Sequence, residues 1–177
     1  MNISLPDRAA SAVAELCPQC GLCCDSTLFA DVELRDDDDP ARLRQLGLTL
    51  VKKGRTKVAF AQPCACFDGT LCGIYGERPV RCRSFECGLL KRVQAGEMPP
   101  EMALKKISAA KRRIAKVRRL LPAPGQLEEK LALVQRYTQA MSTPINLAEG
   151  LTSGSLRGKL LLAYDDLMQT LRRDFLE

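Results

Sequence analysis

The sequence predicts an α-rich fold in which an irregular, metal-stapled N-terminal half with a small β-hairpin precedes a set of C-terminal helices. Two observations favour this fold. All nine cysteines of the 177-residue chain fall between Cys17 and Cys87, so the first half holds every thiol. The second half instead places apolar residues at helical spacing between breaks rich in proline and glycine. We therefore expect a cysteine-cluster metal-binding domain over residues 1–97 and a helical segment over residues 98–177, packed against it as one unit.

Short elements are expected in the N-terminal half. A first helix over residues 8–16 leads into the cysteines. The acidic run and proline of residues 36–40 predict the start of a second helix over residues 41–46, and Gly47 predicts its end. Two β-prone stretches within residues 48–60 flank a Lys-Lys-Gly-Arg turn, which predicts the hairpin.

Three helices are expected in the C-terminal half. The first opens at Pro99 and Pro100 and continues to about Leu121, where a Pro-Ala-Pro-Gly segment ends it. The second covers residues 126–141. The last follows a loop that contains glycines and begins near Ser155.

The cellular compartment decides how the cysteines are interpreted. The N-terminal residues lack the apolar stretch of an export signal, and no apolar run approaches the roughly 20 residues that span a bilayer. We therefore expect a cytoplasmic protein without a membrane partner. Because that compartment keeps thiols reduced, the short cysteine spacings favour metal binding over disulfides.

Four cysteines form a compact motif, Cys17-Pro-Gln-Cys20-Gly-Leu-Cys23-Cys24. We expect the two residues between successive cysteines to form tight turns that let the sulfurs converge, with Gly21 taking an unusual dihedral. The spacing is similar to a ferredoxin run, except that its last cysteine directly follows the third. Adjacent side chains diverge along an extended backbone, so Cys23 and Cys24 are expected to serve two neighbouring centres or two metals of one cluster.

The other five cysteines are more widely spaced, at Cys64, Cys66, Cys72, Cys82 and Cys87. A turn at Asp68-Gly69 is expected to return the chain so that Cys66 and Cys72 meet. Three arginines, Arg78, Arg81 and Arg83, surround Cys82, and nearby cations favour the thiolate form that binds metal. We expect Arg78 and Arg83 to balance the charge of the centre. The acidic neighbours Asp25, Asp68 and Glu86 are expected to cap turns.

These motifs resemble the YkgJ-type cysteine-cluster family, known for a zinc- or iron-chelating domain with the pattern CxxCxxCC. The matching residues are Cys17, Cys20, Cys23, Cys24, Cys66-Phe67, Cys72-Gly-Ile74-Tyr75, Arg78-Pro79, Cys82-Arg83 and Cys87. The resemblance covers about residues 15–90 and implies that the eight cysteines among them bind metal. It leaves Cys64 outside the pattern, as a structural or spare thiol. A larger relative, the flagellin lysine methylase, carries a similar cluster, but this chain is much shorter.

The chain contains no histidine, so any cysteine site is built from sulfur alone. Ligands of that kind select zinc or an iron–sulfur cluster. We favour an iron–sulfur cluster or iron, held by CxxCxxCC together with C-x5-C-x9-C-x4-C, and a redox or protein-modifying activity is compatible with it. Structural zinc is the alternative. No catalytic constellation beyond the cysteines is visible, and the redox or protein partner is unknown.

The helix expected after Pro100 carries eight basic and no acidic residues between Lys105 and Arg119. One narrow apolar stripe contains Ala103, Ile107, Ala110, Ile114, Val117 and Leu121. The opposite side carries Lys105, Arg112, Arg113, Lys116 and Arg119, which we consider as a polyanion-binding surface for nucleic acid or an acidic protein. A solvated face on a packing helix is the favoured interpretation, since aromatic residues and a nucleic-acid motif are missing. In the zinc alternative, this helix contacts the partner.

Overall fold

The computed structural model describes residues 5–122, 131–142 and 154–177. The chain divides into two compact units. The helical unit comprises residues 1–19, 87–123 and 136–177, and the cysteine-rich unit comprises residues 20–86 and 124–135. This division follows spatial contacts, whereas the boundary predicted at residue 97 follows composition and stays a prediction.

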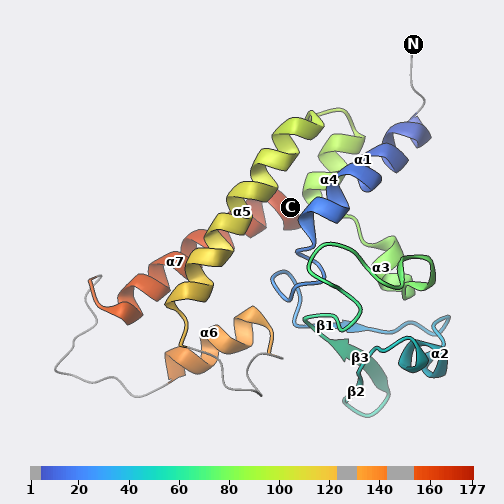
Figure 1. Cartoon of the computed structure of the whole chain (residues 1–177), viewed down its shortest axis with the longest axis horizontal. Coiled ribbons are helices and arrows are strands. Elements are labelled where there is room, and N and C mark those ends of the chain that lie inside the picture. The colour runs from blue at the N-terminus through green and yellow to red at the C-terminus, as the bar shows by residue number, and fades with distance from the viewer. Residues whose placement is uncertain (1–4, 123–130, 143–153) are drawn as a thin grey trace. The chain divides into compact units, whose positions relative to one another are not determined.

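The predicted α-rich fold with a small antiparallel sheet is confirmed in the described residues (Figure 1). The α-helices are α1 (Leu5–Cys20), α2 (Pro40–Gln45), α3 (Val80–Ser84), α4 (Gly88–Gln94), α5 (Pro100–Leu120), α6 (Leu133–Ser142) and α7 (Leu156–Leu171). A 3-10 turn covers Tyr75–Glu77, and a π-helical turn over Arg172–Leu176 continues α7. In the described part of the chain, no helix is long and apolar enough to cross a membrane.

The sheet of the cysteine-rich unit contains the predicted hairpin and one further strand. Strands β2 (Leu50–Lys53) and β3 (Lys57–Ala61) form the hairpin, and β1 (Asp31–Glu33) pairs with the other edge of β3. Phe60 of β3 is 1% exposed and packs with Leu43 and Leu48 into the core of this unit. The sheet therefore presents one apolar side to helix α2 and to the loops that carry cysteines.

Helix α2 has the predicted caps. The Asp39 carboxylate accepts hydrogen bonds from the backbone N–H groups of Ala41 at 2.9 Å and Arg42 at 3.0 Å. These N–H groups have no partner within the helix, so the aspartate stabilises its start. Gly47 takes a φ of +100° just after the helix, as predicted for a glycine that ends one.

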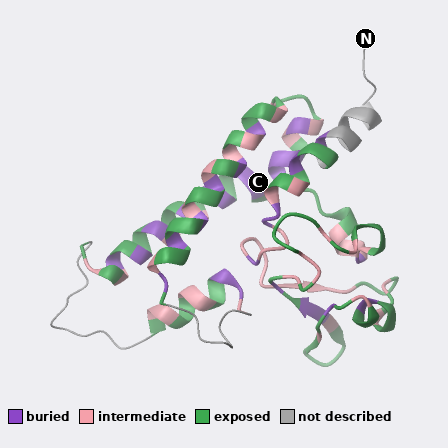
Figure 2. Cartoon of the chain, viewed as in Figure 1, coloured by how far each residue is buried: buried purple, intermediate pink, exposed green. Residues whose placement is uncertain are grey.

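The helical unit is organised by the packing of α5 against α7, which lie side by side in Figure 1. All six residues of the predicted apolar stripe, Ala103 to Leu121, are at most 6% exposed. On α7 the buried residues are Gly158, Leu160, Ala163, Leu167, Thr170 and Leu171. Figure 2 shows buried positions repeating along both helices with exposed ones between them, as expected for amphipathic helices that share a core.

The helices differ from the prediction in several places. Helix α1 extends four residues beyond residue 16, through Pro18 to Cys20. Pro18 lies in the last turn of this helix, where it removes one backbone hydrogen bond. Helix α6 begins at Leu133, so residues 131 and 132 are not helical, and residues 126–130 of the predicted helix lie outside the described part. Helices α3 and α4 were not predicted.

Candidate metal centre

Cys17 and Cys20 lie on the last turn of α1 rather than in the expected tight turn. Residues three apart share one face of a helix, so helical geometry itself holds this pair on one side. Gly21 then takes a φ of +71° and ends the helix. The prediction of an unusual dihedral at Gly21 is therefore confirmed, although its role is that of a helix stop.

Gly21 also lies against the second cysteine segment. A Cβ atom at this position would stand 2.5 Å from Cζ of Phe67, which directly follows Cys66. The backbone N–H of Cys64 donates a 2.9 Å hydrogen bond to the carbonyl of Cys24. One ring contact and one backbone bond thus join the two cysteine segments inside the cysteine-rich unit.

The adjacent thiols Cys23 and Cys24 point to the same side, with their Sγ atoms 3.7 Å apart. The expected divergence is wrong because the backbone is turned here, as hydrogen bonds from the N–H groups of Cys24 and Asp25 to the carbonyl of Gly21 show. Two sulfurs on one tetrahedral metal lie about 3.8 Å apart when each metal–sulfur bond is about 2.3 Å long. The pair therefore fits a single metal atom, in a zinc site or in a cluster.

The segment from Cys66 to Cys72 is the turn predicted from Asp68-Gly69. The Asp68 carboxylate accepts hydrogen bonds of 2.7 Å from the N–H groups of both Thr70 and Leu71. Phe67 and Cys72 form an isolated antiparallel bridge, and the N–H of Gly73 donates to the carbonyl of Cys66 at 2.8 Å. The chain therefore returns and brings Cys72 beside the segment that carries Cys66.

Five thiols have shifted pKa values that describe their surroundings, and the hydrogen bond with Cys23 raises the pKa of Cys24. Burial raises the pKa of Cys82 to about 12 and that of Cys64 to about 11, and it also raises the pKa of Cys66. A hydrogen bond from Cys24 lowers the pKa of Cys23. Buried thiols without metal are thus held in the neutral form, and a metal ion would have to displace their protons.

The three arginines around Cys82 have different contacts. The Arg78 guanidinium lies 3.7 Å from the Tyr75 ring centroid, and its charge acts to lower the pKa of both Cys23 and Cys82. Arg81 pairs with Glu33 at 3.7 Å. The Arg83 side chain is exposed and makes no hydrogen bond or ion pair with the described residues. Of the two arginines predicted to support a cluster, Arg78 lies where its charge lowers the pKa of two thiols, whereas Arg83 faces solvent.

Two of the three acidic residues expected to cap turns, Asp25 and Asp68, do so. Asp25 accepts a 2.9 Å hydrogen bond from the N–H of Thr27, and Asp68 caps the turn described above. Cys17 and Cys87 belong to the helical unit, where the Cys87 sulfur accepts the N–H of Leu90 at 3.5 Å as the N-cap of α4. Seven of the nine cysteines belong to the cysteine-rich unit.

Within the described ranges, no three cysteine, aspartate or glutamate side chains are placed so that they could hold one metal ion. Side-chain rotations would therefore have to precede coordination. The donor set itself fits the metals expected: all nine cysteines are free thiols, and the chain has no histidine. Thiolates of this kind suit zinc or iron–sulfur clusters.

Part of the predicted basic surface of α5 is used inside the helical unit. Arg113 is half-buried and pairs with Asp166 of α7 at 2.9 Å. Arg112 donates to the hydroxyl of Ser108, one turn earlier on the same helix. The remaining three predicted cations, Lys105, Lys116 and Arg119, are exposed and make no ion pair with a described residue.

Residues 16–103 match the family model CxxCxxCC, described as a "putative zinc- or iron-chelating domain". The chain belongs to this family. The match contains every cysteine of the chain and ends within the first turn of α5, so most of the helical unit lies beyond it. No curated protein and no solved structure gives a significant match to the chain.

Proposed function

We propose that this protein holds an iron–sulfur cluster through thiolates of the family pattern. The observation that carries the proposal is the gathering of thiols in the cysteine-rich unit, where the sulfurs of Cys23 and Cys24 lie 3.7 Å apart and a backbone hydrogen bond from Cys64 to Cys24 joins the two cysteine segments, in a chain without histidine. The proposed ligands are Cys17, Cys20, Cys23, Cys24, Cys66, Cys72, Cys82 and Cys87. The family's zinc- or iron-chelating description supports metal binding in general.

Two features favour a cluster over a closed zinc site. The first is the spacing of Cys17, Cys20 and Cys23, which is similar to that of the ferredoxin run. Arg78 places a fixed positive charge near Cys23 and Cys82, which would offset the negative charge of thiolates around a cluster. When bound, such a cluster supplies one-electron transfer.

Anaerobic purification tests this proposal directly. A brown protein with broad visible absorbance, iron and acid-labile sulfide in comparable amounts supports the cluster. A colourless protein with stoichiometric zinc and no sulfide contradicts the cluster and leaves the zinc-stapled module. A protein that takes up neither metal contradicts metal binding by these cysteines altogether.

A second candidate function is a zinc-stapled module that binds a polyanion through α5. The observation that favours it is a shallow cavity of about 390 Å³ in the helical unit, lined by Lys116, Arg119 and Lys159 together with Leu120 and Leu162. The three cations make no ion pair with any residue of the described ranges. These three positive charges line one cavity, where together they would attract an acidic ligand.

Filter binding to RNA, DNA and an acidic peptide at rising salt tests the second candidate. We expect binding at low salt that weakens as salt rises, because released counterions drive such association. The double variant Lys116→Gln, Arg119→Gln should reduce the affinity and the salt slope. Lys91→Gln, an exposed lysine of α4 outside the cavity, is the control. Absent binding, or binding that salt does not change, contradicts this candidate.

A further inference from the structure

We propose that the cavity of the helical unit binds an acidic segment of a partner protein and anchors it through a large apolar side chain. The inference rests on the second candidate function, because it names the class of ligand that this cavity takes. It does not depend on which metal the cysteines hold. It is carried by the pattern of charges along α5 and α7 and by the leucines of the cavity.

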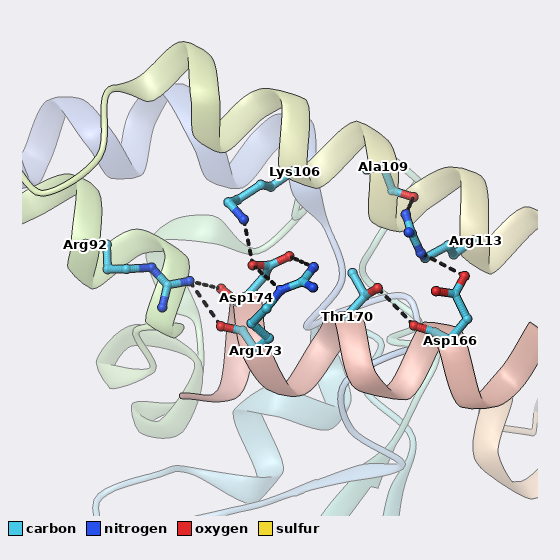
Figure 3. Close-up of polar contacts among 8 residues, drawn as sticks. All are labelled: Arg92, Lys106, Ala109, Arg113, Asp166, Thr170, Arg173 and Asp174. Atoms are coloured by element: carbon cyan, nitrogen blue, oxygen red, sulfur yellow. Dashed lines mark hydrogen bonds and ion pairs between the residues drawn. The ribbon is translucent and has the colours of Figure 1, made fainter.

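Helices α5 and α7 run antiparallel with matched charges over part of their contact. Lys106 pairs with Asp174 in the turn that continues α7, and Arg113 pairs with Asp166 of α7 (Figure 3). The two cations are about two turns apart on α5, and so are the two acids on the opposite segment. Each of these two cations thus has a carboxylate as its partner on the opposite segment.

The next turn of α5 breaks this pattern. One turn beyond Arg113, Lys116 lines the cavity together with Leu162 of α7, and Arg119 and Lys159 line it as well. The described lining residues include no acid, and none of the three cations makes an ion pair with a described residue. Like charges around one cavity repel each other. An acidic group that enters it therefore removes a repulsion and gains an attraction.

The cavity also presents an apolar surface to its ligand. Leu162 is 57% exposed and Leu120 is half-buried, and both line the cavity beside the cations. Burial of exposed leucine surface by a second apolar group is favourable. A ligand that brings carboxylates to the cations and a large apolar side chain to the leucines uses both features of the cavity.

Other anionic ligands use only part of this surface. The phosphate backbone of RNA or DNA would reach the cations but would bring no apolar group to the leucines, and the described lining residues include no aromatic ring for base stacking. A small amphiphile requires a pocket that buries most of its surface, whereas this cavity is shallow. A protein segment covers the cavity with its own surface, and protein interfaces concentrate affinity in anchors of this kind.

Fluorescence anisotropy with the full chain tests the inference. The first probe is a labelled peptide of glutamates with leucines three and four residues apart, and the second has serine at each leucine position and the same charge. We expect the leucine peptide to bind about ten-fold more tightly. Equal affinities, or an RNA strand that binds as tightly as the leucine peptide, overturn the inference and leave the second candidate function intact. Absence of binding to both peptides and to RNA contradicts that function as well.

Variants of two adjacent leucines locate the anchor. Leu162→Ser should weaken binding of the leucine peptide about ten-fold and leave binding of the serine peptide unchanged. Leu161→Ser is the matched control, because Leu161 is 45% exposed but does not line the cavity. Both side chains are exposed, so we expect both variants to fold. Equal effects of the two substitutions on the leucine peptide would overturn the inference.

A second pair of variants tests the charges. Lys159→Gln should weaken binding of both peptides, because it removes one of the three cations that line the cavity. Lys111→Gln, an exposed lysine of α5 outside the cavity, is the control and should change neither affinity. A similar loss in both lysine variants would show that the net charge of the unit attracts the peptides, and would overturn the assignment to this cavity.

Discussion

Lys106 and Asp174 form a buried ion pair that ties α5 to the end of the helical unit. The Lys106 Nζ atom lies 2.7 Å from Oδ1 of Asp174, whose side chain is 5% exposed (Figure 3). Arg173 donates to the other carboxylate oxygen at 2.9 Å, and Arg92 of α4 donates to the backbone carbonyl of Asp174 at 2.7 Å. One residue thus joins three helical segments through its charge and its backbone.

Replacement of Asp174 is expected to destabilise the protein. In Asp174→Asn the buried lysine end loses its counterion, and we expect a loss of about 2 kcal/mol in the free energy of unfolding. This loss of stability is smaller than that expected for a fully enclosed ion pair, because the side chains of Lys106 and Arg173 both reach solvent. Chemical denaturation followed by circular dichroism measures the loss.

Asp166→Asn is the matched control for this change. Asp166 pairs with Arg113 on the same two helices, but its side chain is 52% exposed. Exposed pairs contribute about 0–1 kcal/mol. Equal losses in the two variants would contradict the view that burial makes the Asp174 pair stronger.

The same carboxylate predicts a pH dependence. The hydrogen bonds from Arg173 and Lys106 hold the pKa of Asp174 below its usual range. A carboxyl whose folded-state pKa is depressed stabilises the fold above its unfolded pKa of about 3.9, and the contribution is lost as pH falls through the lower, folded value. The difference in stability between wild type and Asp174→Asn should therefore be constant above about pH 5 and shrink below about pH 4. Denaturation at a series of pH values tests this, and a difference that grows on acidification would refute it.

Substitution of Gly21 is expected to disturb the junction between the cysteine segments. Gly21→Ala places a Cβ against the Phe67 ring at a left-handed φ of +71°, so that backbone strain and a steric clash add. We expect a loss of about 2–4 kcal/mol together with reduced metal content. Thermal unfolding and metal analysis of the purified variant measure both.

Gly54→Ala separates the two contributions. Gly54 has the same φ of +71° in the hairpin turn, and an added Cβ would meet no atom within 4 Å. The Gly54→Ala variant should therefore lose only the free energy of unfolding that the backbone strain costs, about 1 kcal/mol, and should keep its metal. If Gly54→Ala were as damaging as Gly21→Ala, the Phe67 contact would not matter.

A charge substitution tests the role of Arg78. If the proposed centre is correct, Arg78→Gln should weaken metal binding about five-fold, or about 1 kcal/mol, because a positive charge near Cys23 and Cys82 is removed. Arg78→Lys keeps the charge but loses the stacking on Tyr75, so it should recover most of the affinity. Competition with a chelator measures the dissociation constant.

Arg83→Gln is the control, because the Arg83 side chain is exposed to solvent. The same loss in Arg78→Gln and Arg83→Gln would show that net charge matters rather than position. Arg78 and Arg83 are equivalent by sequence, since both lie close to Cys82, and this pair of variants distinguishes them.

Elements with strong local signals could be predicted from the sequence. The caps of α2 at Asp39 and Gly47, and the apolar stripe from Ala103 to Leu121, depend on residues close together in the chain. Strand β1 could not be predicted because its three residues are too few for an alternating pattern and form a strand only by pairing with β3. Helices α3 and α4, with five and seven residues, are likewise too short for a periodic signal.

The candidate site was predictable in its residue types but not in its geometry. Spacing alone indicated which cysteines belong together, yet it suggested a tight turn at Cys17 and divergent side chains at Cys23 and Cys24. Both expectations failed because the backbone is helical up to Cys20 and then turned.

The proximity of Cys23 and Cys24 has a practical consequence. Two thiols 3.7 Å apart form a small chelate that also suits other soft ions, such as cadmium or trivalent arsenic. The metal recovered with this protein will therefore reflect what the host cell supplies as well as what the site prefers. Expression in media of defined metal content, with matched iron and zinc, is the condition under which occupancy becomes a measure of selectivity.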